Sequence, residues 1–219
     1  MAAHDFDAGH IRQQLAAGCA EFNLPVEQHF FVDQCVAFLS ELARWNTAYN
    51  LTAVRDPVAM VGRHILDALT VLPWMQGSHI ADVGTGAGVP GIPLALCLPD
   101  TAFTLLDSNG KKIRFVTHAK GALGLANVTP VQARLEAWVP EPQCSTIVCR
   151  AFTSLAAFIA GAERALMPRG RLIAMKGQRP DEEIDVLPDH WQLSECTPVE
   201  VPGVDEERHV LVMERKDAA

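Results

Sequence analysis

The sequence lacks any apolar run long enough to form a membrane-spanning helix, which takes roughly 20 consecutive apolar residues. It also lacks the beginning of a secretory signal, because Asp5 and Asp7 stand where a basic segment followed by an apolar run is needed. We therefore expect a cytoplasmic protein with no membrane partner.

Closely paired cysteines are absent as well, since none of the six cysteines belongs to a C-x-x-C pair. This spacing argues against a zinc site and against a disulfide framework. Most of the cysteines lie in apolar stretches, which is typical of buried thiols. We expect no bound metal.

The chain has no excess of positive charge: 18 Lys and Arg against 26 Asp and Glu give a net charge of −8. Such a chain does not coat nucleic acid through its overall field. A local basic face remains possible, because basic residues recur at Arg55, Arg63 and Lys176. These three residues are our candidates for binding RNA.

Glycine, in contrast, is concentrated in residues 80–93, which read Ile-Ala-Asp-Val-Gly-Thr-Gly-Ala-Gly-Val-Pro-Gly-Ile-Pro. The pattern predicts a short buried strand, a loop in which every second residue is glycine, and the first turn of a helix. Pro90 and Pro93 suit a helix start, where a missing N–H costs no intrahelical hydrogen bond. A strand, glycine loop and helix in this order indicate a site for a nucleotide-type cofactor.

Two cofactors fit the glycine spacing. Gly86, Gly88 and Gly91 match G-x-G-x-x-G, the dinucleotide pattern. A dinucleotide would bring its pyrophosphate close to Asp82, whereas a carboxylate attracts the sulfonium and ammonium groups of S-adenosylmethionine. The sequence therefore favours S-adenosylmethionine. Asp107, roughly 20 residues beyond the loop, suits the ribose hydroxyls of either cofactor.

The 219 residues divide into two predicted regions, a helical extension over 1–76 and a cofactor-binding domain over 77–219. In the second region strands and helices alternate, which predicts a parallel sheet with helices on both faces. The last two strands follow one another directly and predict an antiparallel pair. Strands are expected at 79–84, 102–107, 128–132, 145–150, 170–176, 190–199 and 208–215, and helices at 90–98, 110–123, 154–166 and 180–187.

In the extension, Asp56 and Pro57 predict the start of a helix, as an N-cap followed by proline. Apolar residues recur at the helical period both before and after this point. We place Trp45, Asn46 and residues 49–52 in the turn between two helices. Arg63 and Asp67 are spaced to pair along the second helix.

Several segments, taken together and in order, resemble a known family. They are Trp45-Asn46 with Tyr49-Asn50-Leu51-Thr52, Arg63-His64-x-x-Asp67, residues 82–93, Leu105-Leu106-Asp107-Ser108 with Gly110-Lys111-Lys112, Arg150-Ala151-Phe152, and Lys176-Gly177. Over nearly its whole length the chain resembles the bacterial ribosomal small-subunit methyltransferase G family. The resemblance implies a class I methyltransferase (Rossmann-like) fold, an α/β fold whose seven-stranded sheet ends in an antiparallel strand.

The resemblance also implies an activity: transfer of a methyl group from S-adenosylmethionine to N7 of one guanosine in 16S ribosomal RNA, with that RNA or the small ribosomal subunit as partner. The cofactor-binding residues expected from the loop and the family pattern are Gly84, Gly86, Val89, Asp107, Leu135, Glu136 and Arg150.

Guanine N7 bears a lone pair and no proton, so no general base is needed and no catalytic residue is assigned. Arg150-Ala151-Phe152-Thr153 replaces the Asn/Asp-Pro-Pro-aromatic segment of enzymes that methylate exocyclic amines, which disfavours those substrates. Cys149 lacks the Pro-Cys context of the pyrimidine C5 enzymes, and we interpret it as a buried thiol.

Two other functions stay open from the residues alone. The protein could methylate a small molecule or a protein, with the helical extension as a lid, or it could bind the cofactor without catalysis. We expect a monomer. An enzyme acting on RNA should lose affinity for its substrate steeply as salt rises.

Overall fold

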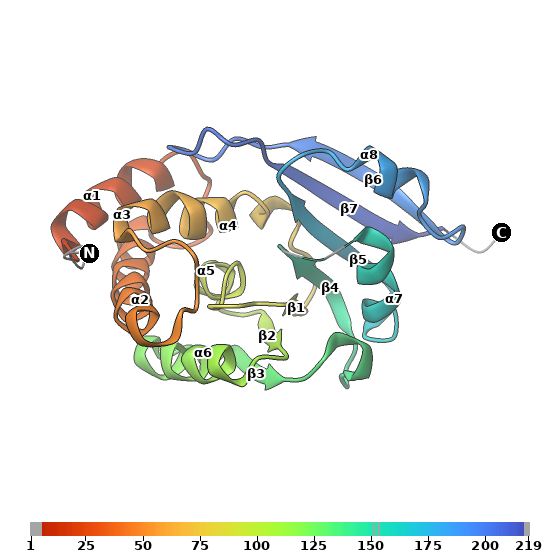
Figure 1. Cartoon of the computed structure of the whole chain (residues 1–219), viewed down its shortest axis with the longest axis horizontal. Coiled ribbons are helices and arrows are strands. Elements are labelled where there is room, and N and C mark those ends of the chain that lie inside the picture. The colour runs from red at the N-terminus through yellow and green to blue at the C-terminus, as the bar shows by residue number, and fades with distance from the viewer. Residues whose placement is uncertain (1–5, 151, 153, 217–219) are drawn as a thin grey trace.

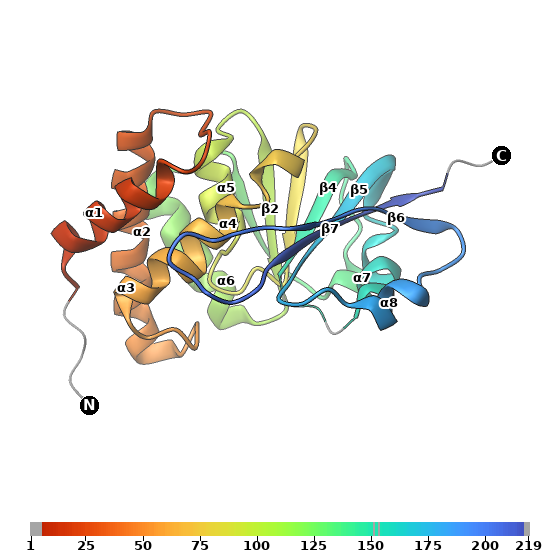
Figure 2. The same cartoon turned by 90° about the horizontal axis from the view of Figure 1, so that it is seen from above.

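A computed structural model describes residues 6–150, 152 and 154–216. Figures 1 and 2 show helices at the N-terminal end of the molecule, a central twisted sheet, and a long hairpin at the C-terminal end. The strands are β1 His79–Val83, β2 Ala102–Asp107, β3 Val128–Gln132, β4 Cys144–Cys149, β5 Leu166–Lys176, β6 Trp191–Pro198 and β7 His209–Arg215. The α-helices that follow β1 are α5 Gly91–Cys97, α6 Gly110–Leu123, α7 Leu155–Ala162 and α8 Asp181–Asp185.

The sheet has seven strands in the order β3-β2-β1-β4-β5-β7-β6. The first five strands are parallel, whereas β7 runs antiparallel to both β5 and β6. Because β1 and β4 are neighbours although they are distant in the chain, a crossover lies between them, where ligands of open α/β sheets bind. This arrangement confirms the predicted class I methyltransferase fold.

Alternate residues of each strand enter two separate cores, one on each face of the sheet. Ile80 and Leu105 pack under α5, α6 and the N-terminal helices, while Ala81 and Leu106 pack under α7. Both faces are covered, which explains why β1 is buried from Ile80 to Val83.

The N-terminal helices are α1 Ala8–Cys19 and α2 Gln28–Tyr49. The prediction that Trp45 and Asn46 lie in a turn is wrong, because α2 continues to Tyr49 and ends at Asn50, whose φ of 51° is left-handed. Nothing in that segment breaks a helix before Asn50. Trp45 packs its ring 5.7 Å from Phe115 of α6, so it joins the extension to the sheet layer.

The next helical segment begins where predicted, since Asp56 caps it by accepting a hydrogen bond from the N–H of Val58. It is one continuous stretch composed of α3 Pro57–Met60, a π-helical turn η1 Val61–Leu66, and α4 Asp67–Leu69. A short 3-10 turn, η2 Leu72–Trp74, leads into β1. The π-helical turn was not foreseen, because a single wider turn leaves the apolar pattern almost unchanged.

Two boundaries differ from the prediction. The helix predicted over 154–166 ends at Ala162, and the strand predicted over 170–176 begins earlier, at Leu166, so β5 passes through the connection expected at 167–169. The register shifts between Cys144 and Thr146 where β4 pairs with β5, and this irregularity accommodates Pro168 within a strand.

One hydrophobic core joins the extension to the sheet, from Ile11 of α1 to Val212 of β7. The helices of the extension are therefore packed on the sheet. Within the described residues, no helix is long and apolar enough to cross a bilayer.

Candidate functional site

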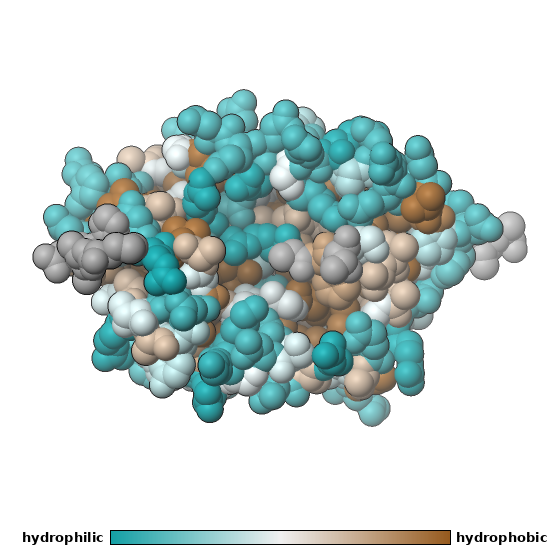
Figure 3. Space-filling model, viewed as in Figure 1, coloured by the Kyte–Doolittle hydropathy of each residue, from teal (hydrophilic) through white to brown (hydrophobic). Residues whose placement is uncertain are grey.

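The glycine loop lies between β1 and α5, at the carboxyl ends of the parallel strands. Gly84, Gly86 and Gly88 have φ values of +71°, +60° and +84°, which other residues rarely adopt. No atom lies within 4 Å of where a Cβ on Gly84 would be, so the backbone there is open to a ligand. Figure 3 shows this face of the molecule, mostly hydrophilic and hollowed near its middle, with hydrophobic side chains in the hollow.

Asp82 lies beneath the loop and has no exposed surface. Its Oδ2 accepts hydrogen bonds from the Thr85 hydroxyl at 2.6 Å and from the N–H of Gly91 at 2.8 Å. Its Oδ1 has no hydrogen-bond partner among the described residues. Burial raises the pKa of this carboxyl to about 6, although both hydrogen bonds act in the opposite direction. Asp82 thus joins the loop to the start of α5 and keeps one acceptor free.

Asp107, at the end of β2, closes the loop from the other side. Its Oδ2 accepts from the N–H of Gly86 at 3.0 Å and lies 3.4 Å from the ammonium of Lys112. Its Oδ1 accepts from the N–H of Asn109, the N-cap of α6. The carboxylate is therefore held in a fixed orientation beside the loop.

A small cavity of about 150 Å³ opens at this point. Four predicted cofactor-binding residues line it: Gly84, Asp107, Leu135 and Glu136. Phe152 lines it as well. Leu135 and Glu136 reach it from a 3-10 turn, η3 Leu135–Ala137, after β3. The structure thus brings together residues from the ends of β1, β2 and β3.

The other three predicted cofactor-binding residues do not line this cavity. Gly86 donates its N–H to Asp107, as described above. Val89 is buried in the core, and its N–H donates to the carbonyl of Thr85. Arg150 lies outside the small cavity and lines a second one.

The second cavity, of about 450 Å³, is rich in cationic side chains. Arg150 donates through Nη1 to the carbonyl of Arg63 at 2.9 Å and to Asp67 Oδ2 at 3.4 Å. Asp67 also accepts from Nε of Arg208 at 3.0 Å. Three arginines therefore line the cavity, and two of them contact its one buried carboxylate.

Asp67 and Arg208 were not foreseen as site residues. Arg63 was expected to pair with Asp67, but it pairs with Glu206, which faces it from the loop before β7. The π-helical turn ends at Leu66, directly before Asp67, and changes which side chains share a face. No local signal marks Arg208, since it follows three acidic residues.

The remaining RNA-binding candidates are placed as follows. Arg55 is exposed and donates to the Asn50 side chain at 2.8 Å. Lys176, at the end of β5, contacts both carboxylate oxygens of Glu183 at 2.9 and 3.1 Å. Arg63 is the one of the three that lines the second cavity.

Two neighbouring side chains, Cys149 and His64, are uncharged near pH 7. Cys149 is 2% exposed, and burial raises the pKa of its thiol far above the usual value, so a reactive thiolate is disfavoured. His64 is buried, and burial lowers its pKa to about 4, so its ring is neutral near pH 7. Across residues 6–150, 152 and 154–216, no three His, Cys, Asp or Glu side chains are grouped to hold a metal.

The fold is shared with solved methyltransferase structures of low sequence identity. TrmN from Thermus thermophilus has a TM-score of 0.56 at 21% identity, covering 78% of this chain and 53% of that one. A SAM dependent methyltransferase from Aquifex aeolicus has a TM-score of 0.56 at 18% identity, covering 71% and 93%. At these identities the likeness concerns the fold alone.

Sequence relatives are much closer. Ribosomal RNA small subunit methyltransferase G from Marinobacter nauticus is 46% identical over 204 residues, 93% of this chain and 95% of the relative. The protein of the same name from Yersinia pestis is 46% identical over 195 residues, 89% and 93% of the two chains. The family model described as rRNA small subunit methyltransferase G matches residues 32–211. The chain therefore belongs to the rRNA small subunit methyltransferase G family.

Proposed function

We propose that this protein transfers a methyl group from S-adenosylmethionine to N7 of a guanosine in the 16S RNA of the small ribosomal subunit. Membership of the family supports the class of substrate and reaction. The single structural observation that supports the cofactor is the loop of left-handed glycines bracketed by two buried carboxylates, Asp82 and Asp107.

The residues around the small cavity are of the chemical types that bind S-adenosylmethionine. Asp107 is oriented to accept from ribose hydroxyls, and Leu135 offers an apolar surface to the adenine. The free Oδ1 of Asp82 is a buried acceptor near the loop, suited to a cationic ligand and unsuited to a pyrophosphate. Gly86 and Val89 belong to the same loop as Gly84, whereas Arg150 lines the second cavity.

When bound, the cofactor would supply a methyl group on a positively charged sulfur. The task of the chain is then to hold guanine N7 in line with that methyl group and to exclude water, since N7 has no proton to remove. The methylated base is cationic, so carboxylates and carbonyls near it stabilise the transition state. In the second cavity, Asp67 and the Arg63 carbonyl are such groups.

Arg150 is well placed to distinguish guanine. An arginine facing guanine usually donates to both O6 and N7, but N7 must stay free for the reaction. Because Nη1 of Arg150 is already held by the Arg63 carbonyl, its remaining donors are available for O6. Arg55, Arg63 and Lys176 supply positive charge for the surrounding RNA.

The experiment that tests this function uses small ribosomal subunits from cells lacking the modification. The subunits are incubated with the protein and isotopically labelled S-adenosylmethionine, and the labelled nucleoside is identified after digestion. We expect 7-methylguanosine, at one equivalent per subunit. A labelled pyrimidine, a labelled exocyclic amine, or labelling of ribosomal protein contradicts the proposal.

A further inference from the structure

The second cavity is separate from the one assigned to the cofactor. No described residue lines both, and Arg150 and Phe152, two positions apart in the chain, lie on different cavities. At about 450 Å³ it lies within the usual volume range of ligand pockets and is large enough for a single nucleotide. Its wall comes from the π-helical turn, the ends of β4 and β5, and the segment before β7.

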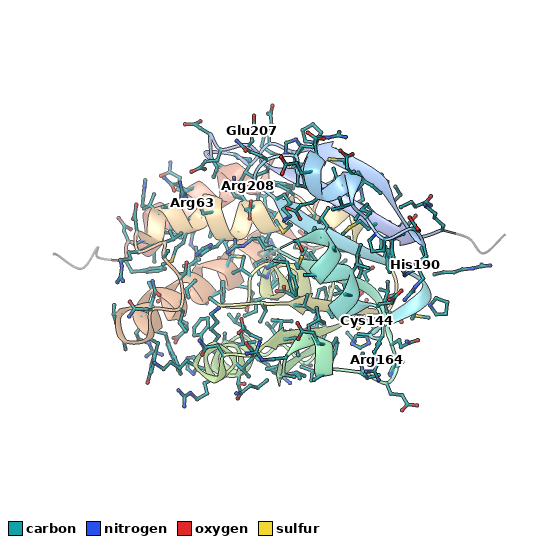
Figure 4. All side chains as sticks on the ribbon, turned by 45° about the vertical axis from the view of Figure 1, so that its right-hand side comes forward. Arg63, Cys144, Arg164, His190, Glu207 and Arg208 are labelled. Carbon is teal, nitrogen blue, oxygen red and sulfur yellow. The ribbon has the colours of Figure 1, made fainter. Side chains whose placement is uncertain are left out.

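Three guanidinium groups face this cavity in fixed positions. Asp67, with 4% of its side chain exposed, accepts from Arg208 and Arg150 through different oxygens. Arg208 also donates through Nη1 to the carbonyl of Glu207 at 2.8 Å. Figure 4 shows Arg63, Glu207 and Arg208 gathered at one edge of the molecule. One carboxylate thus orients two arginines that come from distant parts of the chain.

Apart from the arginines and Asp67, the wall is uncharged and consists of polar, apolar and small residues. His64 Nδ1 lies 3.0 Å from the Arg63 carbonyl, so that nitrogen carries the proton, and Nε2 accepts from the Thr52 hydroxyl at 3.0 Å. Ala53 and Gly177 leave room beside these groups. A cavity with guanidinium donors held in place, and with the polar groups of His64 and Thr52 in its wall, suits an anionic, hydrogen-bonding ligand.

The other large hollows of the molecule do not suit an anion. Two cavities, of about 750 and 970 Å³, lie beside the segment 198–209 and are bordered by acidic residues. Their carboxylates repel a polyanion, whereas the second cavity contains three arginines and a single acidic side chain. RNA phosphate is therefore directed to the second cavity.

From these observations we propose that the second cavity receives the target nucleotide of the RNA. Arg208 contacts a phosphate next to that nucleotide, and Asp67 is a positioning residue that orients Arg208 and Arg150. This inference rests on the proposed function and adds to it the place where the RNA substrate enters.

Substitutions of Glu206 and Arg208 should change the affinity for RNA in opposite directions. The Glu206 carboxylate is about half exposed, pairs with Arg63, and lies 3.9 Å from Nη2 of Arg208. It therefore occupies the place of an anion at the rim of the cavity. If a phosphate binds there, removing the carboxylate strengthens binding, while removing the arginine weakens it.

The experiment compares Arg208→Ala and Glu206→Gln with the wild type, using unmodified small subunits. We expect Arg208→Ala to raise the KM for subunits about tenfold, and Glu206→Gln to lower it severalfold. Binding of S-adenosylhomocysteine, measured by calorimetry, should change less than about twofold in both, because neither residue lines the small cavity. Arg164→Ala, at an exposed arginine that lines neither cavity, is the matched control and should equal the wild type.

Salt dependence separates a phosphate contact from a structural role. The slope of log KM against log salt should be smaller by about one in Arg208→Ala than in the wild type, and unchanged in Arg164→Ala. An unchanged KM and slope in Arg208→Ala overturns the inference, as does Glu206→Gln raising the KM. Wild-type protein that fails to methylate subunits overturns the proposed function instead, so the two failures are distinguishable.

Discussion

Asp82 is a carboxyl group whose ionisation the folded chain disfavours. Burial raises its pKa from an ordinary 3.8 to about 6, so between these values the folded state holds a proton that the unfolded state has released. The stability associated with the neutral form is complete below the unfolded pKa and is lost as the pH rises through the folded one. The ionised carboxylate therefore destabilises the ligand-free protein at neutral pH.

We predict that Asp82→Asn removes the loss of stability that ionisation of Asp82 causes as the pH rises. The free energy of unfolding of the ligand-free variant, relative to wild type, should increase by on the order of 2–3 kcal/mol between about pH 4 and pH 7. Urea unfolding at a series of pH values measures it, and the comparison with wild type cancels the other titrating groups. A stability difference that does not vary with pH would mean that Asp82 titrates normally.

Asp107 has a different role, because it combines a loop contact with a free face toward the small cavity. Replacing it by alanine removes the acceptor for the Gly86 N–H and, by our proposal, for the ribose. We predict at least a tenfold loss of affinity for S-adenosylhomocysteine, about 1.4 kcal/mol or more, by calorimetry. Asp100→Ala, at an exposed position before β2, is the control and should bind normally. Equal affinities for both variants would exclude Asp107 from the cofactor site.

At the scale of elements, the start of α5 depends on a close approach to β1 and β2. A Cβ on Gly91 would lie 2.8 Å from Asp82 Oδ2 and 2.8 Å from Leu105 Cγ, both in the packed interior. Gly121 in α6 is also helical, but a Cβ there meets nothing within 4 Å. A glycine-to-alanine substitution therefore meets packed atoms in α5 and open space in α6.

We predict that Gly91→Ala destabilises the protein by about 1–3 kcal/mol, because the added methyl group displaces packed atoms. Gly121→Ala should stabilise it by up to about 1 kcal/mol, since alanine is the better helix former. Thermal or urea unfolding of both variants provides the measurement. A destabilised Gly121→Ala, or a tolerated Gly91→Ala, would contradict this account of the packing.

The elements that follow regular patterns could be predicted from the sequence, and those that break a pattern could not. The strands β1, β2 and β3 and the helix α6 were placed within a residue of their observed bounds, because apolar runs and Asn109-Gly110 mark them. The π-helical turn has no such mark, so Arg63 was paired with the wrong partner. Pro168 looked like a turn residue but lies in a strand, because an irregularity between β4 and β5 accommodates it.

The same distinction holds for the site. Residues that follow a strand, such as Gly84 and Asp107, are predictable because the carboxyl ends of parallel strands meet at one edge. Arg208 lies far along the chain from the other site residues. It is held at the site by Asp67, a buried carboxylate in the extension. Only the three-dimensional packing of the extension against the sheet brings the two together.

For the whole molecule, the net charge of −8 opposes association with RNA, so binding must rely on the local arrangement of arginines. We predict that the KM for small subunits rises at least tenfold between about 50 and 200 mM salt. The affinity for S-adenosylhomocysteine should change little over this range, because a small ligand without phosphates releases few counterions on binding. If neither the KM for subunits nor the affinity for S-adenosylhomocysteine changed with salt, a small substrate would be favoured over RNA.

The reaction itself should be insensitive to pH, because N7 of guanine needs no general base. His64 is neutral from pH 7 to pH 9, since burial lowers its pKa to about 4. The Cys149 thiol stays protonated over the same range, because burial raises its pKa well above the usual value. With saturating subunits and cofactor, we expect a single-turnover rate constant that varies less than about twofold from pH 7 to pH 9. A rate that climbs tenfold per pH unit would reveal a proton removed in the transition state, which points to an exocyclic amine as the acceptor. The same preparation of subunits, analysed for its labelled nucleoside at both ends of the range, then connects the pH profile to the atom that is methylated.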